Sequence, residues 1–148
     1  MPLFLGALVQ RARVIASASP DPNTKVGAII FRSQDGSVEV EACNTFPDGI
    51  SGTKKWRLLR PHKYDWIEHA ERRAILLAAN RRIQIRRCSI LVSGGFPCPA
   101  CSRAIIQSGI SSVYYEFREL DVTRWEKTYD ISREMLGEAG ISFEYISQ

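Results

Sequence analysis

Two short segments of the sequence carry side chains that could bind a metal ion. The first contains His69, and the second contains Cys98 and Cys101 in a Cys-x-x-Cys spacing. One imidazole and two thiolates are good zinc ligands, and a catalytic zinc typically takes three protein ligands and leaves the fourth position for water. The cysteine pair stands where a helix is expected to begin, and the positive end of a helix dipole favours thiolate over thiol. His69, Cys98 and Cys101 are therefore candidate ligands of one zinc ion per chain.

Glu71 offers the acid–base group that such a metal would need. It stands two residues after His69, and two residues so spaced on a helix do not face each other. Glu71 therefore need not bind the metal and can reach a water and a substrate beside it. A carboxylate in that place can take the proton of the water and pass it to a leaving group. We expect Glu71 to be the catalytic residue.

Each motif has a simpler interpretation when it is taken alone. A His-x-Glu triplet is common without any function, and a Cys-x-x-Cys pair could be a thioredoxin-like redox pair or half of a structural zinc site. The sequence holds no second pair of closely spaced cysteines, because Cys43 and Cys88 stand apart. These two are typical of small buried apolar residues. The presence of both motifs in this order favours the zinc interpretation.

The pattern of apolar residues predicts alternating strands and helices. We expect strands at residues 25–31, 38–44, 88–93, 112–117 and 141–146 and helices at residues 3–18, 65–80, 99–108 and 124–138. Such alternation indicates an α/β fold with parallel strand pairs and helices on both faces, and an early hairpin makes the sheet mixed. The expected architecture is three layers, α-β-α, around a five-stranded mixed sheet. The carboxyl ends of neighbouring strands would bring the two motifs together, and the long loop at residues 46–64 is typical of a functional segment.

The composition is that of a globular protein. The chain has 148 residues, of which 45% are apolar and 24% charged, and this size favours one domain over residues 1–148. The apolar N-terminus follows no basic region, so we expect no secretory signal, a cytoplasmic location and reduced cysteines. The net charge is +4, and 15 of the 20 basic residues are arginine. Because the planar guanidinium suits phosphate well, this excess indicates an anionic substrate or effector.

The residues around both motifs resemble those of a known family. Residues 21–28, 44–49 and 96–110 are similar, in this order, to the first-strand segment, the Asn-x-(Met/Phe)-Pro-x-Gly loop and the zinc-binding helix of the deoxycytidylate (dCMP) deaminase family. A His-x-Glu triplet with a later Pro-Cys-x-x-Cys is also the general signature of zinc nucleobase deaminases. The resemblance covers the chain from Ser19 to Ser147. At a wider level, the sequence resembles the zinc-dependent cytidine deaminase superfamily.

The resemblance implies a hydrolase with a cytidine deaminase-like fold. Its activity would be the zinc-dependent deamination of a pyrimidine deoxynucleotide, dCMP to dUMP plus ammonia. It implies zinc ligands at His69, Cys98 and Cys101 and a proton shuttle at Glu71.

The resemblance also implies contacts to the substrate. Asn44 would contact the sugar or base edge, the backbone at Ala70 would hold the exocyclic amino end, and Trp125 would bring an aromatic ring against the base. Asn44 could instead be an ordinary turn residue, and Trp125 could pack in the core. A phosphate clamp would draw on a set of basic residues, namely Lys25, Arg57, Arg60 and Lys63.

Departures from the family pattern leave the substrate open. Arg73 stands where the family usually has asparagine, so it could meet the substrate, and Gly94-Gly95 is unusually small and could widen the pocket. The same chemistry could act on a cytidine nucleoside, a modified pyrimidine nucleotide, a guanine-like base, or adenosine or cytidine in a nucleic acid. An alternative of another class is a non-catalytic zinc-stabilised module that binds nucleotides.

The partners follow from the same resemblance. We expect a small-molecule nucleotide, no membrane and no nucleic acid, and assembly with further copies of the chain as a dimer or a hexamer. Family members often carry an activating site for a nucleotide with Mg²⁺, and the sequence does not locate one here.

Overall fold

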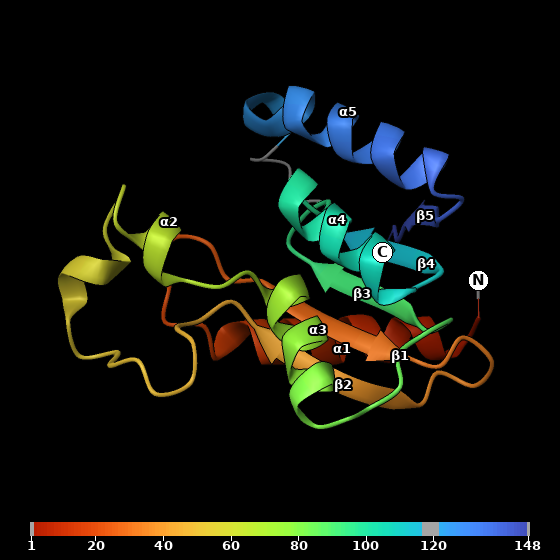
Figure 1. Cartoon of the computed structure of the whole chain (residues 1–148), viewed down its shortest axis with the longest axis horizontal. Helices are drawn as coiled ribbons and strands as arrows, with labels where there is room; N and C mark the ends of the chain where they lie inside the picture. The colour runs from red at the N-terminus through yellow and green to blue at the C-terminus, as the bar shows by residue number, and fades with distance from the viewer. Residues whose placement is uncertain (1, 117–121, 148) are drawn as a thin grey trace.

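A five-stranded mixed sheet forms the centre of the molecule (Figure 1). The computed structural model describes residues 2–116 and 122–147, and it describes residues 122–125 by their backbone alone. The strands are β1 (Gly27–Phe31), β2 (Val38–Cys43), β3 (Ser89–Ser93), β4 (Ser112–Glu116) and β5 (Ser142–Tyr145), in the order β2-β1-β3-β4-β5. β1 pairs antiparallel with β2 and β3, whereas β3-β4 and β4-β5 are parallel. The predicted mixed sheet is confirmed.

Helices cover both faces of this sheet. They are α1 (Phe4–Ser17), the 3-10 helix η1 (Lys55–Leu58), α2 (Lys63–Trp66), α3 (Ala70–Asn80), α4 (Pro99–Ser108) and α5 (Val122–Glu138). α1 buries Leu5, Leu8 and Val9 against Ile29 and Leu91 on one face. α3, α4 and α5 contribute to a larger core on the other face. The three-layer α-β-α prediction is confirmed, and no helix in the described part of the chain is long and apolar enough to cross a membrane.

α1 approaches β1 so closely that only glycine fits at the contact. A Cβ atom on Gly27 would lie 2.1 Å from the carbonyl oxygen of Ala12. Ala12 and the neighbouring Ala28 are fully buried, so neither backbone can move away without disturbing the packing on both sides. The close approach fixes the layer of α1 on the sheet.

The helix predicted at residues 65–80 is wrong at its first turns. α2 ends at Trp66 and α3 begins at Ala70, and the residues between them are extended. The reason is a pair of backbone hydrogen bonds between two segments that are distant in the sequence. The N–H of Glu68 donates to the carbonyl of Thr45 at 2.9 Å, and the N–H of Thr45 donates back to Glu68 at 3.2 Å. This bridge interrupts the helix and leaves His69 at the N-terminus of α3.

Residues 46–66, here called the arm, extend away from the sheet (Figure 1). They contain η1 and α2. The guanidinium of Arg57 lies 3.7 Å from the centre of the Trp66 ring, and the rings of Trp56 and Trp66 meet edge to face at 5.7 Å. The cation and the two rings thus hold the arm together from within.

Two glycine substitutions test the contact between α1 and β1. Gly27→Ala should lower the free energy of unfolding by roughly 1–3 kcal/mol, because the added methyl overlaps the backbone of α1. Gly137→Ala is the matched control. It adds the same methyl in α5, where nothing lies within 4 Å, and alanine is the better helix former, so stability should rise by roughly 0.4–1 kcal/mol. Urea unfolding measures both changes, and equal effects would contradict the account.

Candidate active site

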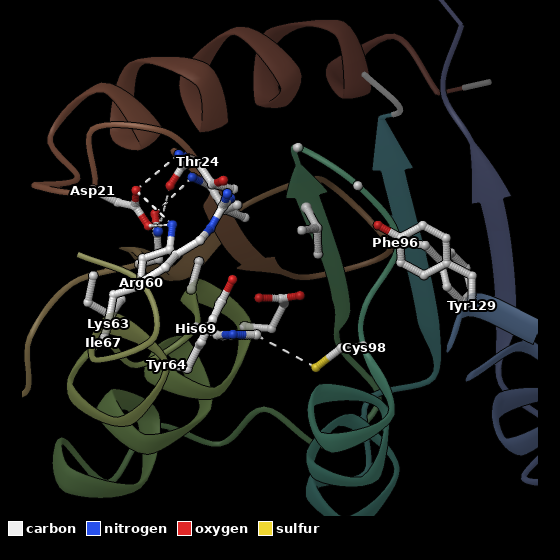
Figure 2. A pocket seen from close by; sticks show the side chains of 17 residues that line it. Asp21, Thr24, Arg60, Lys63, Tyr64, Ile67, His69, Phe96, Cys98 and Tyr129 are labelled. Carbon is white, nitrogen blue, oxygen red and sulfur yellow. Dashed lines mark hydrogen bonds and ion pairs between the residues drawn. The ribbon is translucent and has the colours of Figure 1, made fainter. Parts of the chain in front are cut away.

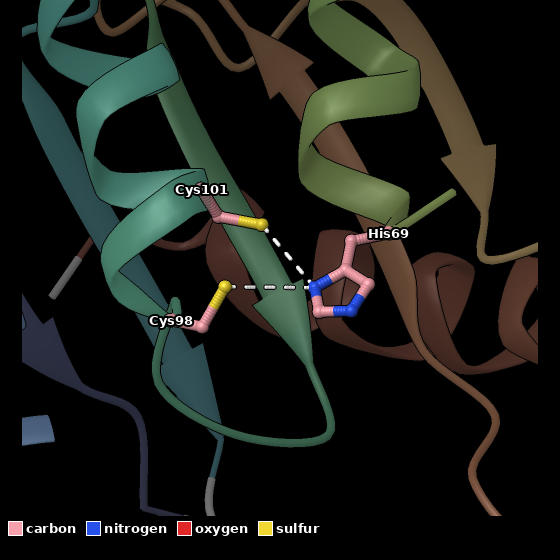
Figure 3. A group of neighbouring side chains, drawn as sticks. All are labelled: His69, Cys98 and Cys101. Atoms are coloured by element: carbon pink, nitrogen blue, oxygen red, sulfur yellow. Dashed lines mark hydrogen bonds between the residues drawn. The ribbon is translucent and has the colours of Figure 1, made fainter. Parts of the chain in front are cut away.

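The side chains of His69, Cys98 and Cys101 converge at the N-termini of α3 and α4 (Figure 3). His69 and Cys98 are the residues just before α3 and α4, and both are extended. The His69 Nδ1 atom lies 3.6 Å from Cys98 Sγ and 3.4 Å from Cys101 Sγ. A tetrahedral zinc with bonds of ~2.3 Å to sulfur and ~2.0–2.1 Å to nitrogen would separate such atoms by about 3.6 Å. The three side chains therefore fit a zinc ion.

The electrostatics of this cluster suit a cation. Hydrogen bonding from Cys101, assisted by His69, lowers the pKa of Cys98 to about 3 although burial opposes the change. The same contact raises the pKa of Cys101, so the pair shares one proton and Cys98 carries the negative charge. Arg72, which sequence reasoning did not single out, acts on both sulfur atoms by its charge and is held 2.6 Å from Glu68.

Glu71 lies beside the cluster in the first turn of α3. Its side chain is almost completely buried, at 5% exposed, and it lines the same cavity as His69 and Cys98. Burial raises the pKa of Glu71, while the charge of His69 acts in the opposite direction. A carboxyl group, a thiolate and an imidazole thus meet at one wall of one cavity.

The cavity has a volume of about 260 Å³, close to the ~300 Å³ lower end of small-molecule sites. In the view of Figure 2, Asp21, Thr24, Arg60 and Lys63 gather at one side and Phe96 and Tyr129 at the other, with His69 and Cys98 between them. A charged side and an aromatic side therefore flank the candidate metal ligands.

Comparison with known proteins agrees with this geometry. Residues 5–117 match the family model of the cytidine and deoxycytidylate deaminase zinc-binding region. A deaminase of Aliivibrio fischeri described as uncharacterized, from the luxG 3′ region, is 35% identical over 138 residues, which are 93% of this chain and 89% of that protein. The chain belongs to the deoxycytidylate deaminase family of the cytidine deaminase superfamily. It is therefore a zinc-binding deaminase, a hydrolase that acts on the C–N bond of a cyclic amidine.

Two further relatives carry more specific names. The human deoxycytidylate deaminase is 35% identical over 105 residues, which are 68% of this chain and 57% of the human enzyme. The structure of the dCMP deaminase of cyanophage S-TIM5, in complex with dCMP and dUMP, superposes with a TM-score of 0.77 at 25% identity. That match covers 99% of this chain and 98% of the phage chain.

In this deaminase, Asn44 and Ala70 line the cavity. The Asn44 side chain accepts the N–H of Val26 and donates to the carbonyl of Thr24, both at 2.8 Å. Asn44 therefore has a structural role in holding this turn at the cavity wall, and its contact with a substrate stays a prediction. Ala70 is fully buried and begins α3, and the role of its backbone likewise stays a prediction.

Lys25 and Arg73 do not line the cavity. The Lys25 ammonium donates to the carbonyl of Ser19. Arg73 forms an ion pair of 3.1 Å with Asp48 and borders a separate hollow beside the start of the arm. The contact of either side chain with a substrate stays a prediction.

The aromatic side of the cavity comes from residues that the sequence did not reveal. The side chain of Trp125 lies outside the described residues. Tyr129, one helical turn later on α5, lines the cavity, and its ring meets Phe96 edge-on at 5.9 Å. The spacing of four residues was the available signal, because it places Tyr129 on the same helix face as the predicted Trp125.

Gly94 and Gly95 keep the cavity open on this side. Their φ angles are +114° and +135°, which side chains rarely adopt, and a Cβ on Gly95 would lie 3.1 Å from the Tyr129 hydroxyl. Both glycines line the cavity. Backbone conformation and space thus both require glycine here.

Of the basic residues considered for a phosphate, two line the cavity. These are Arg60 and Lys63. Lys63 is paired with Asp21, and Arg57 is stacked on Trp66 within the arm. Arg60 is exposed, and none of the ion pairs found among residues 2–116 and 126–147 involves it. Arg60 is the guanidinium best placed to meet an anion.

Replacing one of the candidate zinc ligands tests the metal centre. Cys98→Ala should remove zinc, since two remaining ligands bind it poorly, whereas Cys88→Ala should keep about one zinc per chain because Cys88 lies elsewhere in the core. Metal analysis of both purified variants gives the occupancy. A chelator should also lower the melting temperature of the wild type and of Cys88→Ala but not of Cys98→Ala. Full zinc content in Cys98→Ala would contradict the assignment.

Proposed function

We propose that this deaminase hydrolyses dCMP to dUMP and ammonia. The observation that carries the proposal is one cavity that joins the His69, Cys98, Cys101 and Glu71 constellation to the exposed guanidinium of Arg60, for which no ion pair is found among the described residues. The first group serves deamination, and the second serves a phosphate. The dCMP and dUMP complex of the phage relative and the human dCMP deaminase support the same substrate.

Glu71 would move the protons of the reaction. Zinc held by His69, Cys98 and Cys101 would lower the pKa of a water molecule bound to it, so that this water can lose a proton near neutral pH. Glu71 takes a proton from the attacking water and delivers it to N3 of the pyrimidine while the oxygen bonds to C4. Glu71 then carries the second proton to the amino group, the C4–N bond breaks and ammonia leaves. One water is consumed, and the oxygen at C4 of dUMP comes from it.

The remaining cavity residues would orient the nucleotide. Phe96 and Tyr129 offer apolar ring surface for the pyrimidine. Arg60, at the opposite side in Figure 2, would receive the 5′-phosphate. A nucleotide would contact both the aromatic side and the cationic side of the cavity, whereas a free base has no phosphate for the cationic side. The arrangement would therefore favour a nucleotide.

Glu71→Gln tests the proton path. The amide keeps the size of the side chain but cannot carry a proton, so kcat should fall by roughly 10²–10⁴-fold. Zinc content should stay unchanged because the three ligands remain. Glu144→Gln, an exposed change on β5, is the control and should keep full activity. Ammonia release measures the rate, and a Glu71→Gln enzyme with wild-type kcat would overturn the mechanism.

Arg60→Ala tests the phosphate contact. Loss of a charged hydrogen bond should raise KM for dCMP by roughly 10- to 100-fold and leave kcat/KM for deoxycytidine nearly unchanged, since that substrate has no phosphate. Arg81→Ala removes an exposed arginine after the end of α3 and should change neither value. An equal loss on both substrates would contradict a phosphate role for Arg60.

A substrate panel decides between dCMP and the alternatives. Ammonia release should be measured on zinc-loaded enzyme with dCMP, CMP, dCTP, deoxycytidine, cytidine, 5-substituted dCMP, guanine and adenosine. The proposal predicts the highest kcat/KM for dCMP and a large loss for deoxycytidine. A preference for guanine or adenosine, or turnover that does not depend on the phosphate, would refute it.

A further inference from the structure

A buried ion pair joins the arm to the body of the enzyme at the edge of the cavity. The Lys63 ammonium lies 3.0 Å from Oδ2 and 3.3 Å from Oδ1 of Asp21. The two side chains are only 6% and 5% exposed. The Asp48–Arg73 pair, which also joins the arm to the body, has a partner that is 74% exposed. Water therefore screens the second pair far more than the first.

Asp21 is fixed by its own turn. Its Oδ1 atom accepts the backbone N–H groups of Asn23 at 2.9 Å and Thr24 at 3.1 Å. Burial alone would raise the pKa of Asp21, but these two bonds and the Lys63 ammonium together lower it. The same turn is held by Asn44 through Thr24 and Val26. The carboxylate is therefore charged and belongs to the rigid body.

Lys63 belongs to the arm, and its backbone is hydrogen-bonded to residues on either side of it. The backbone N–H of Lys63 donates to the carbonyl of Leu59 at 2.9 Å, and the backbone carbonyl of Lys63 accepts the N–H of Ile67 at 3.0 Å. Arg60, Tyr64 and Ile67, all within four residues of Lys63, line the cavity. The position of the Lys63 side chain therefore sets the position of this cavity wall.

The aromatic cluster of the arm cannot supply this positioning. Arg57, Trp56 and Trp66 contact one another, and all three belong to the arm. Such contacts make the arm rigid but do not orient it against the sheet. The bridge between Thr45 and Glu68 anchors the arm only at its two ends.

We propose that the Asp21–Lys63 ion pair is a positioning element that holds Arg60 and its neighbours at the cavity for substrate binding. The inference rests on the proposed function, because Arg60 is taken there as the phosphate contact. An arm position that separates the pair loses an interaction that is strong because the two side chains are shielded from water. The pair thus keeps the cation side of the cavity in place before a substrate arrives.

Three variants separate this role from others. Asp21→Asn keeps the Oδ1 acceptor of the turn and removes only the charge. Lys63→Met keeps the length of the side chain without the ammonium. The double variant removes both charges and leaves none unpaired. Asp48→Asn, at the exposed pair, is the matched control. Kinetics with dCMP, zinc content and the rate of tryptic cleavage of the arm at Lys54 and Lys55 are measured for each.

Both single variants should raise KM for dCMP by about tenfold or more, keep kcat within about threefold and keep zinc, while cleavage of the arm becomes faster. The double variant should be no worse than either single variant, since the two changes remove one interaction. Asp48→Asn should behave as wild type. If Asp21→Asn does not fold, the double variant carries the test, because it buries no unpaired charge.

Other results would overturn the inference. If Lys63 itself binds the phosphate, Asp21→Asn frees it and KM falls. If the pair only stabilises the fold, the melting temperature drops while KM and arm cleavage stay unchanged. Failure of the proposed function looks different: the wild type then shows no turnover of dCMP. In that case the rate of arm cleavage still tests the positioning role. If both single variants are cleaved at the same rate as the wild type, the positioning role is refuted.

Discussion

The two backbone hydrogen bonds between Thr45 and Glu68 are the constraint on which the active site depends. They hold the chain extended before α3, so the helix begins at Ala70 and His69 stands free of it. Without them, the apolar pattern would continue a helix through this segment and carry the imidazole into its interior. Because Asn44 precedes Thr45 directly, the same bridge also joins the candidate metal ligand to the turn that lines the cavity.

The chemistry is concentrated where two helices begin. α3 and α4 both direct their N-termini at the cluster in Figure 3, and the positive ends of helices favour thiolates. Glu71 is buried beside them, and Arg72 adds a positive charge near both sulfur atoms. The site thus combines a thiolate, a thiol, a carboxyl group and an imidazole without leaving them in an apolar environment, which would be costly.

The body and the arm divide the work of the enzyme. The body supplies the candidate metal ligands, Glu71 and the aromatic side of the cavity, and the arm supplies Arg60 and Lys63. The body is held by two apolar cores across the sheet, whereas the arm is held by a cation between aromatic rings and by one buried ion pair. Under the proposed function, changes in the arm alter the choice of substrate while the deamination chemistry stays in the body.

The sequence by itself determined the motifs, the order of strands and helices and the family, because residue type and short-range periodicity carry that information. Only the tertiary structure decided where α3 begins, that Tyr129 lines the cavity, and that Arg60 faces it while Lys25 and Arg73 have other partners. These facts depend on contacts between segments far apart in the chain, such as Thr45 with Glu68 and Asp21 with Lys63. A local pattern shows which residues can act, but the direction of a side chain follows from the partner that the fold brings to it.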